Sequence, residues 1–427
     1  MTKRLTKHAM ALVATLLASA GLQAALPQAT PAESRIAAAR SRIEAAPQRA
    51  DAHAALAMAL ARRARETADP EFYEQAAVAA DHALAIEPDN RDAERARIWI
   101  ELGRHEFARA LELATAYSAK APDDLSGQGF LVDANVELGN YEAAERAAQW
   151  MLDLRPGNIP GLTRAAYLRE LFGDTDGALD LMRMALQRTP PAETEDLAWT
   201  LTQIGHLHLS RGETDKANAA LERALALFPD YHYALGAQAQ VRTAQGRFAE
   251  AADLQARRYR NAPHPENLFQ LAKAQERAGR RDAARTSFRA FERAALAEAG
   301  KADNSNRELV FYYADQARDA ARALAISRTE LARRQDVFTL DAHAWALHRA
   351  GHHAEARRTM QRALDVGIRD AAMRYRAGAI AAAGGDRVAA LARLRESLAI
   401  DAHSEVAAPA ARLIAQLQAR SNRIAAR

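Results

Sequence analysis

Prolines recur along this 427-residue chain at an interval that few folds can accommodate. Pro88, Pro122, Pro156 and Pro190 are each 34 residues apart, Pro229 follows after 39 residues, and Pro263 after another 34. Between these prolines the apolar residues follow a helical period rather than the alternation of a β-strand. A fixed period of this length is typical of arrays built from one repeated pair of helices. The sequence therefore predicts an all-α fold of stacked helical hairpins.

Small residues recur with the same period and mark where the two helices of each hairpin turn and touch. A glycine stands at each predicted turn, an alanine follows it by five residues, and another small residue usually precedes it by seven. Two helices can approach closely only where side chains are small. The turn glycines are Gly139, Gly173, Gly212, Gly246, Gly279, Gly351 and Gly385; the alanines are Ala144, Ala178, Ala217, Ala251, Ala284, Ala356 and Ala390; the preceding residues are Ala166, Gly205, Ala239, Ala272, Ala344 and Gly378.

This pattern resembles the tetratricopeptide repeat (TPR), and the resemblance covers nearly the whole chain. The clearest unit runs from Asp196 to Asp230 and holds Leu201, Gly205, Gly212, Ala217, Ala224 and Pro229 where the family has them. The resemblance implies a right-handed α-solenoid whose concave groove binds the partner. Because such repeats serve many unrelated partners, the fold alone does not identify the ligand.

The repeat pattern also divides the chain into regions. Two units depart from it: Gly103 comes two residues early relative to Pro122, and the unit at 301–335 is degenerate, with Gln316 where the turn glycine should stand. We expect a lone helix at each end to cap the stack. The predicted regions are a signal peptide (1–24), a linker and lone capping helix (25–50), about ten TPR-like repeats (51–404), and a C-terminal capping helix and tail (405–427).

The N-terminus has the three-part order of a secretory signal peptide. A basic segment (1–8) precedes an apolar run (9–22) and the small residues Ala24 and Ala25. The run is shorter than the ~20 residues that span a bilayer as a helix. An uncleaved leader acting as an anchor is the alternative to cleavage near Ala24. Since the chain has no cysteine for a lipid anchor, we predict a periplasmic or secreted protein with no transmembrane helix in its mature form.

Composition excludes several functional classes. The absence of cysteine rules out disulfides, thiolate metal sites and a cysteine nucleophile. The chain has 58 Lys and Arg against 54 Asp and Glu. Lys3, Arg4 and Lys7 lie in the leader, which leaves 55 basic residues in the mature chain. That near balance provides no electrostatic footprint for nucleic acid.

Motifs for catalysis or cofactor binding are missing from the sequence. No phosphate-binding glycine loop, nucleophile elbow, His-Glu-x-x-His motif or calcium loop occurs. The best metal candidate is the cluster of His343, His348, His352 and His353, but the turn at Gly351 separates its members. We therefore predict no metal, no cofactor and no enzymatic activity.

The family register also predicts which first-helix residues face the concave groove. They lie 13, 10, 6, 3 and 2 residues before each turn glycine, and several are aromatic, which suggests a platform for an extended peptide. Packing of these aromatics between neighbouring hairpins is the alternative; we assign Trp99, Trp150 and Phe172, which fall elsewhere, to packing. The predicted groove residues are Tyr167, Glu170, Trp199, Thr202, His206, Tyr233, Phe269, Lys273, Arg277, Trp345, His348, Arg349 and Tyr375.

Together these features favour a non-enzymatic exported scaffold or adaptor that binds a protein or peptide in the groove. Its contact with a membrane would be through that partner, and its oligomeric state is left open. One alternative is a periplasmic assembly factor or holding chaperone for envelope or metal-handling membrane proteins, which would bind many clients. Another is an enzyme with an unrecognised site, for which the chain offers no separate catalytic module.

Overall fold

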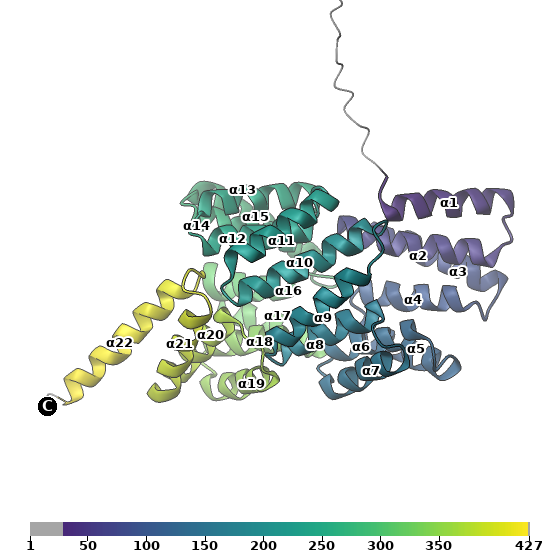
Figure 1. Cartoon of the computed structure of the whole chain (residues 1–427). Helices are drawn as coiled ribbons and strands as arrows, with labels where there is room; N and C mark the ends of the chain where they lie inside the picture. The colour runs from purple at the N-terminus through teal and green to yellow at the C-terminus, as the bar shows by residue number, and fades with distance from the viewer. Residues whose placement is uncertain (1–28, 426–427) are drawn as a thin grey trace, which may run out of the picture.

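The protein is a solenoid of antiparallel helical hairpins, which confirms the predicted all-α fold (Figure 1). The computed structural model describes residues 29–425, and within that range it contains no strand. Each first helix packs against its own second helix, and each second helix packs against the helix that follows it. The hairpins are α2 (Ala50–Thr67) with α3 (Glu71–Ile86), α4 (Arg91–Gly103) with α5 (Phe107–Lys120), α6 (Leu125–Glu137) with α7 (Tyr141–Leu154), α8 (Ile159–Leu171) with α9 (Thr175–Arg188), α10 (Thr194–Ser210) with α11 (Thr214–Leu227), α12 (His232–Ala244) with α13 (Phe248–Asn261), α14 (Pro265–Arg277) with α15 (Arg281–Glu298), α16 (Asn306–Phe311) with α17 (Ala320–Arg333), α18 (Val337–Arg349) with α19 (His353–Val366), and α20 (Ala371–Ala383) with α21 (Arg387–Ile400).

Single helices lie at the two ends of the stack, α1 (Pro31–Ala45) and α22 (Ala407–Ala425). A capping box in which Thr30 and Glu33 bond to each other's backbone begins α1. In Figure 1, α22 extends away from the other helices at the C-terminal end. No helix in residues 29–425 has the length and apolar character needed to cross a membrane. The predicted signal peptide (1–24) lies outside the described residues.

The predicted turn glycines adopt the backbone conformation that glycine permits most readily. At all seven of them φ lies between +72° and +86°, the left-handed region that a Cβ atom disfavours. Two hairpins use another residue at this position: His105 (φ 62°) between α4 and α5, and Arg318 (φ 56°) before α17. The expectation that Gln316 occupies the turn position of the degenerate unit was wrong. Gln316 instead ends a π-helical turn, Tyr312–Gln316, that lengthens α16.

Close helix crossing explains the small residues that recur within the hairpins. A Cβ atom added at Gly205 would lie 2.8 Å from Cγ of Leu221, and one at Gly378 would lie 2.7 Å from Cγ of Leu394. The seven alanines that follow the turn glycines are at most 3% exposed. Interiors are packed as densely as organic crystals, so a larger side chain at these positions would push the two helices apart.

The solenoid curves back on itself, so that hairpins far apart in the sequence are in contact and the concave face is closed in places. The α6–α7 turn meets the loop before α18: the Gln335 N–H donates to the Glu137 carbonyl at 3.0 Å, and the Val337 N–H donates to the Tyr141 hydroxyl at 2.8 Å. The α8–α9 turn meets the loop before α20, where Gly173 lies against the carbonyl of Gly367. The inner face is therefore divided into cavities.

The N-terminal hairpin is joined to the middle of the chain by charged groups. Arg62 and Arg65 of α2 form ion pairs with Asp196 of α10, at 2.7 and 2.6 Å between nitrogen and oxygen. Arg65 also pairs with Glu195, whose side chain is fully buried. Glu195 in turn accepts a hydrogen bond of 2.6 Å from the Tyr231 hydroxyl. These contacts fix α2 against α10 and α12, which lie far from it in the sequence.

Candidate functional site

A cavity of about 350 Å³ lies where the inner face of the middle hairpins meets the C-terminal hairpins. Consecutive first helices α8, α10, α12 and α14 form one wall. The opposite wall consists of Phe338 of α18, residues 368–372 at the start of α20, and Ile400, Asp401, Ser404 and Glu405 at and after the end of α21. We call this space the main cavity. Four of the predicted groove residues line it: Glu170, His206, Lys273 and Arg277.

A histidine–carboxylate pair forms one part of the main cavity. Nε2 of His206 lies 2.8 Å from Oε1 of Glu170. The His206 side chain is 45% exposed, and that surface faces the cavity. Burial alone would lower the pKa of His206, but the hydrogen bond and charge of Glu170, together with Asp370, outweigh it and raise the pKa. His206 therefore carries positive charge at a higher pH than a free histidine does.

Two basic residues of α14 form another part of the cavity, and the loop before α22 contacts both. Nζ of Lys273 lies 2.7 Å from a carboxylate oxygen of Glu405. The Arg277 guanidinium donates to the carbonyl oxygen of His403 at 2.8 Å. Burial would raise the pKa of Glu405, but the charge of Lys273 and its hydrogen bond outweigh burial and lower it. The cavity therefore favours a carboxylate at this position.

The repeat register did not predict several of the residues that line the main cavity. Gln255 lies on a second helix, α13, and is only 7% exposed. Its Oε1 atom has no hydrogen-bond partner within the described residues. Asp370 and Glu405 come from loops of distant hairpins. Only the closure of the solenoid brings these three groups to the site, and a count along one helix carries no signal of it.

Tyr233 lines a separate cavity of about 200 Å³, which we call the second cavity. Its lining includes Tyr73 and the histidines His105, His232 and His264. Burial lowers the pKa of His105 to about 3, with the charges of Arg334 and Arg307 contributing. Burial likewise lowers the pKa of His232 to about 4. Both imidazoles are consequently neutral near pH 7.

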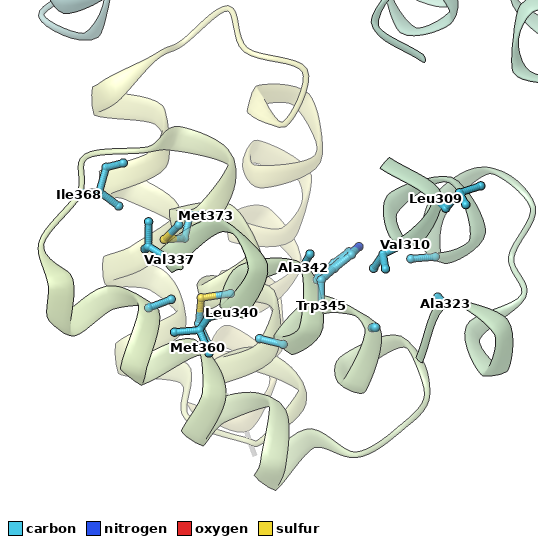
Figure 2. Packing of buried hydrophobic residues seen from close by; sticks show 14 of the residues in the cluster. Leu309, Val310, Ala323, Val337, Leu340, Ala342, Trp345, Met360, Ile368 and Met373 are labelled. Atoms are coloured by element: carbon cyan, nitrogen blue, oxygen red, sulfur yellow. The ribbon is translucent and has the colours of Figure 1, made fainter. Parts of the chain in front are cut away.

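Three predicted groove residues are buried in packing contacts instead. Thr202 is 4% exposed, and its hydroxyl donates to the carbonyl of Ala198 in its own helix at 2.7 Å. Phe269 is 4% exposed, and its ring centroid lies 4.9 Å from that of Phe291. Trp345 is 5% exposed and points towards Val310 of α16 (Figure 2). None of the three presents an open surface to a partner.

Trp345 gathers the other predicted residues of α18 and α20 into one cluster. Its indole N–H donates to Asp315 at 3.0 Å, and its ring stacks on His348 with centroids 5.0 Å apart. Tyr375 lies 6.1 Å from the Trp345 ring, and the Arg349 guanidinium lies 5.9 Å from it. This cluster holds α16, α18 and α20 together and does not line the main cavity.

Two predicted residues lie between packing and surface. Trp199 is partly buried against two core clusters. Tyr167 is 37% exposed, and burial together with the carboxylates of Glu137 and Asp336 raises its pKa. Of the aromatics assigned to packing, Trp99 and Trp150 are partly buried against the core, whereas Phe172 is 38% exposed.

The histidines considered for metal binding have other contacts. His343 is 5% exposed, and its Nδ1 lies 2.9 Å from the Ser327 hydroxyl. The rings of His348 and His353 lie 5.1 Å apart, and burial lowers the pKa of His348 to about 4. Among residues 29–425, no three His, Asp or Glu side chains are arranged to hold a metal ion.

The fold and the main cavity define a helical-repeat scaffold, a class whose inner surfaces commonly bind other proteins. One hairpin matches a known repeat: a sequence model described as "Tetratricopeptide repeat" matches residues 200–231, which begin in α10, include α11 and end just before α12. No curated protein matches the chain in sequence.

Solved structures with similarity to this chain include a TPR protein. A thermophilic TPR protein of Thermus thermophilus is 24% identical, with a TM-score of 0.34, over 37% of this chain and 84% of its own. The type IV pilus biogenesis factor PilW is 14% identical, with a TM-score of 0.41, over 50% of this chain and 94% of its own. Yeast Tom70 is 14% identical, with a TM-score of 0.35, over 86% and 96%. At these TM-scores none of the similarities bears on partner or pathway.

Proposed function

We propose that this chain is a non-enzymatic, exported scaffold that binds an extended segment of a protein partner in the main cavity. One observation carries the proposal: residues chosen only by repeat register, Glu170, His206, Lys273 and Arg277, converge on a single cavity. The buried Oε1 of Gln255, which has no hydrogen-bond partner among residues 29–425, supplies an acceptor that a peptide N–H would satisfy. Cavities of a few hundred Å³ with a few convergent polar groups are typical of binding sites.

Export is the part of the proposal that rests on sequence alone. The order of basic, apolar and small residues at the N-terminus supports a cleaved leader. The mass of the protein isolated from its host tests this point directly. A mature chain beginning near Ala25 in the periplasm or the medium supports export, and an intact chain in the cytoplasm contradicts it.

Site-specific photocrosslinking in the host envelope tests the binding site. A photoreactive amino acid would replace Gln240, which lines the main cavity, or, as a matched control, Val388, which is 83% exposed on the second helix α21. We expect one protein to be captured from position 240 and not from position 388. Its capture should weaken when Glu170→Gln and Lys273→Gln are introduced together.

The other outcomes separate the rival functions. Many different clients captured from position 240 would favour an assembly factor or holding chaperone. Capture from position 388 alone would place the interface at α21, away from the main cavity, and contradict the proposal. Capture that persists unchanged in the Glu170→Gln/Lys273→Gln variant would show that these cavity groups do not contribute to binding.

A further inference from the structure

The loop between α21 and α22 occupies the basic part of the main cavity with an acidic segment of the chain's own sequence. This loop, residues 401–405, reads Asp-Ala-His-Ser-Glu. Its Glu405 carboxylate forms an ion pair with Lys273, and the backbone carbonyl of His403 accepts a hydrogen bond from Arg277. We infer that this loop stands in for the partner, and that the partner segment itself is acidic. The inference rests on the proposed function, because it names the chemistry of the segment bound at that site.

The geometry of the loop is that of a bound peptide. One side-chain carboxylate pairs with an ammonium group, and a main-chain carbonyl two residues earlier accepts from a guanidinium. Both donors lie on one helix, α14, four residues apart, so they face the same side. The loop joins them from a distant part of the sequence. A carboxylate-bearing segment from another chain could form the same two contacts without any rearrangement of α14.

The charges around the loop select an acidic occupant. Lys273 outweighs the effect of burial on the pKa of Glu405, and the charges of Arg376 and Arg277 also act to lower it. Arg277 has a further unpaired donor, because its Nε is buried with no hydrogen-bond partner within residues 29–425. Burial also lowers the pKa of Arg277, against the charges of Glu405 and Asp401, so a segment that displaced the loop would need carboxylates of its own to replace theirs. A neutral or basic segment would leave these groups without compensation.

The loop is held loosely enough to be replaced. Glu405 is 40% exposed and Lys273 is 28% exposed at the side chain, and ion pairs with that degree of exposure are weak. Ala402 and His403 are exposed. Helix α22, which follows the loop, packs mainly against α21 and to a smaller extent against α20. Val406, which directly follows the loop, is 7% exposed, so displacement would release residues 401–405 from α14 while Val406 and α22 stay packed.

A peptide with the sequence of the loop provides the test. The probe is a fluorescein-labelled peptide of residues 399–407, and a second peptide carries Asn and Gln in place of its Asp and Glu. Binding to the full mature chain is measured by fluorescence anisotropy. We expect the acidic peptide to bind and the neutral one to bind at least about tenfold more weakly, because charge-assisted hydrogen bonds are lost.

Variants of the protein show where the peptide binds. Glu405→Gln weakens the internal competitor, so it should tighten binding of the acidic peptide by about threefold to fivefold, the range expected from an exposed ion pair. Lys273→Gln/Arg277→Gln should weaken binding at least about tenfold. Arg280→Gln is the matched control, since Arg280 precedes α15 and pairs with Asp253, away from the cavity; it should leave binding unchanged. Circular dichroism verifies that each variant is folded.

Three results would overturn the inference. These are no binding of the acidic peptide to either the wild type or Glu405→Gln, equal binding of the acidic and neutral peptides, and binding that the Lys273→Gln/Arg277→Gln variant retains. The proposed function fails separately, through the crosslinking experiment. If position 240 captures a partner but the acidic peptide does not bind, the cavity is a binding site and only its preference for acidic segments is wrong.

Discussion

Two glycines in hairpin turns offer a matched test of the contact between the α6–α7 turn and the loop before α18. Gly139 and Gly212 occupy the same position in their hairpins, and both have φ of +76°. A Cβ atom at Gly139 would lie 2.7 Å from the carbonyl oxygen of Gln335, whereas none of the described atoms lies within 4 Å of one at Gly212. Alanine therefore introduces the same backbone strain at both sites but a steric clash at Gly139 alone.

The expected magnitudes follow from these two terms. A left-handed conformation costs a non-glycine residue about 1–2 kcal/mol, which sets the local destabilisation of Gly212→Ala. Overpacking adds about 1–3 kcal/mol, and at Gly139 it acts on the contact with the loop before α18. The amides of Gln335 and Val337 donate hydrogen bonds across that contact. Their opening free energy should fall by about 1–3 kcal/mol, which accelerates their exchange about 5-fold to 150-fold.

Hydrogen exchange followed by mass spectrometry reads this effect in an unmutated segment. The peptide covering 334–338 should exchange faster in Gly139→Ala and at the wild-type rate in Gly212→Ala. Because a repeat array can unfold locally, a global melting curve would blur this difference. Equal exchange of that peptide in Gly139→Ala and wild type would refute the described contact. Equal acceleration by Gly212→Ala would show that turn strain alone, and not the clash, is responsible.

Three further predictions concern charged groups. Arg65→Met removes the main ion-pair partner of the fully buried Glu195. It should destabilise the α2–α10 contact by about 3–5 kcal/mol, measured as faster hydrogen exchange in α2. The double variant Arg65→Met/Glu195→Gln should recover part of the loss, and no recovery would argue against a specific pair. Burial and the charge of a neighbouring carboxylate raise the pKa of Glu137 from 4.5 to about 7. Between these pH values the folded state binds a proton that the unfolded state has lost, so the free energy of unfolding should fall as pH rises from about 4.5 to 7. In urea denaturation Glu137→Gln should remove this pH dependence, and a dependence that persists would assign it to other groups. Glu170→Gln should lower the pKa of His206 in an NMR titration, because the charge and hydrogen bond of Glu170 raise it in the wild type. The wild-type pair stabilises the fold at low pH, and this stability is lost as pH rises through the raised pKa. An unchanged pKa would contradict the described pairing.

The repeated features of the fold could be predicted from the sequence because they depend on neighbours along the chain. The 34-residue period, the turn glycines and the small residues at helix crossings are all local requirements of one hairpin. The degenerate unit was the exception: Arg318, not Gln316, takes the left-handed position, because a π-helical turn extends α16 by several residues. A π-helical turn leaves no signal in a pattern of small residues.

The candidate site was predictable only on the side that the repeat register controls. Counting back from the turn glycines identified Glu170, His206, Lys273 and Arg277, which line one wall of the main cavity. The same count also selected Phe269 and Trp345, which are buried. An inner-face aromatic can turn either into the groove or between hairpins, and the choice depends on the size of the neighbouring side chains. The opposite wall comes from loops whose approach depends on the summed curvature of many hairpins.

Closure of the solenoid limits what can bind in its interior. A space of about 350 Å³ admits a few side chains or a short extended segment, not a folded domain. A larger partner would require the turns to separate, which breaks contacts such as those of Gln335 and Val337 with the α6–α7 turn. Since each hairpin is stabilised mainly by its neighbours, these few contacts could open while the hairpins stay folded. Faster exchange at 334–338 in the presence of a partner would therefore indicate an opened solenoid, and unchanged exchange would indicate a segment bound within the closed one.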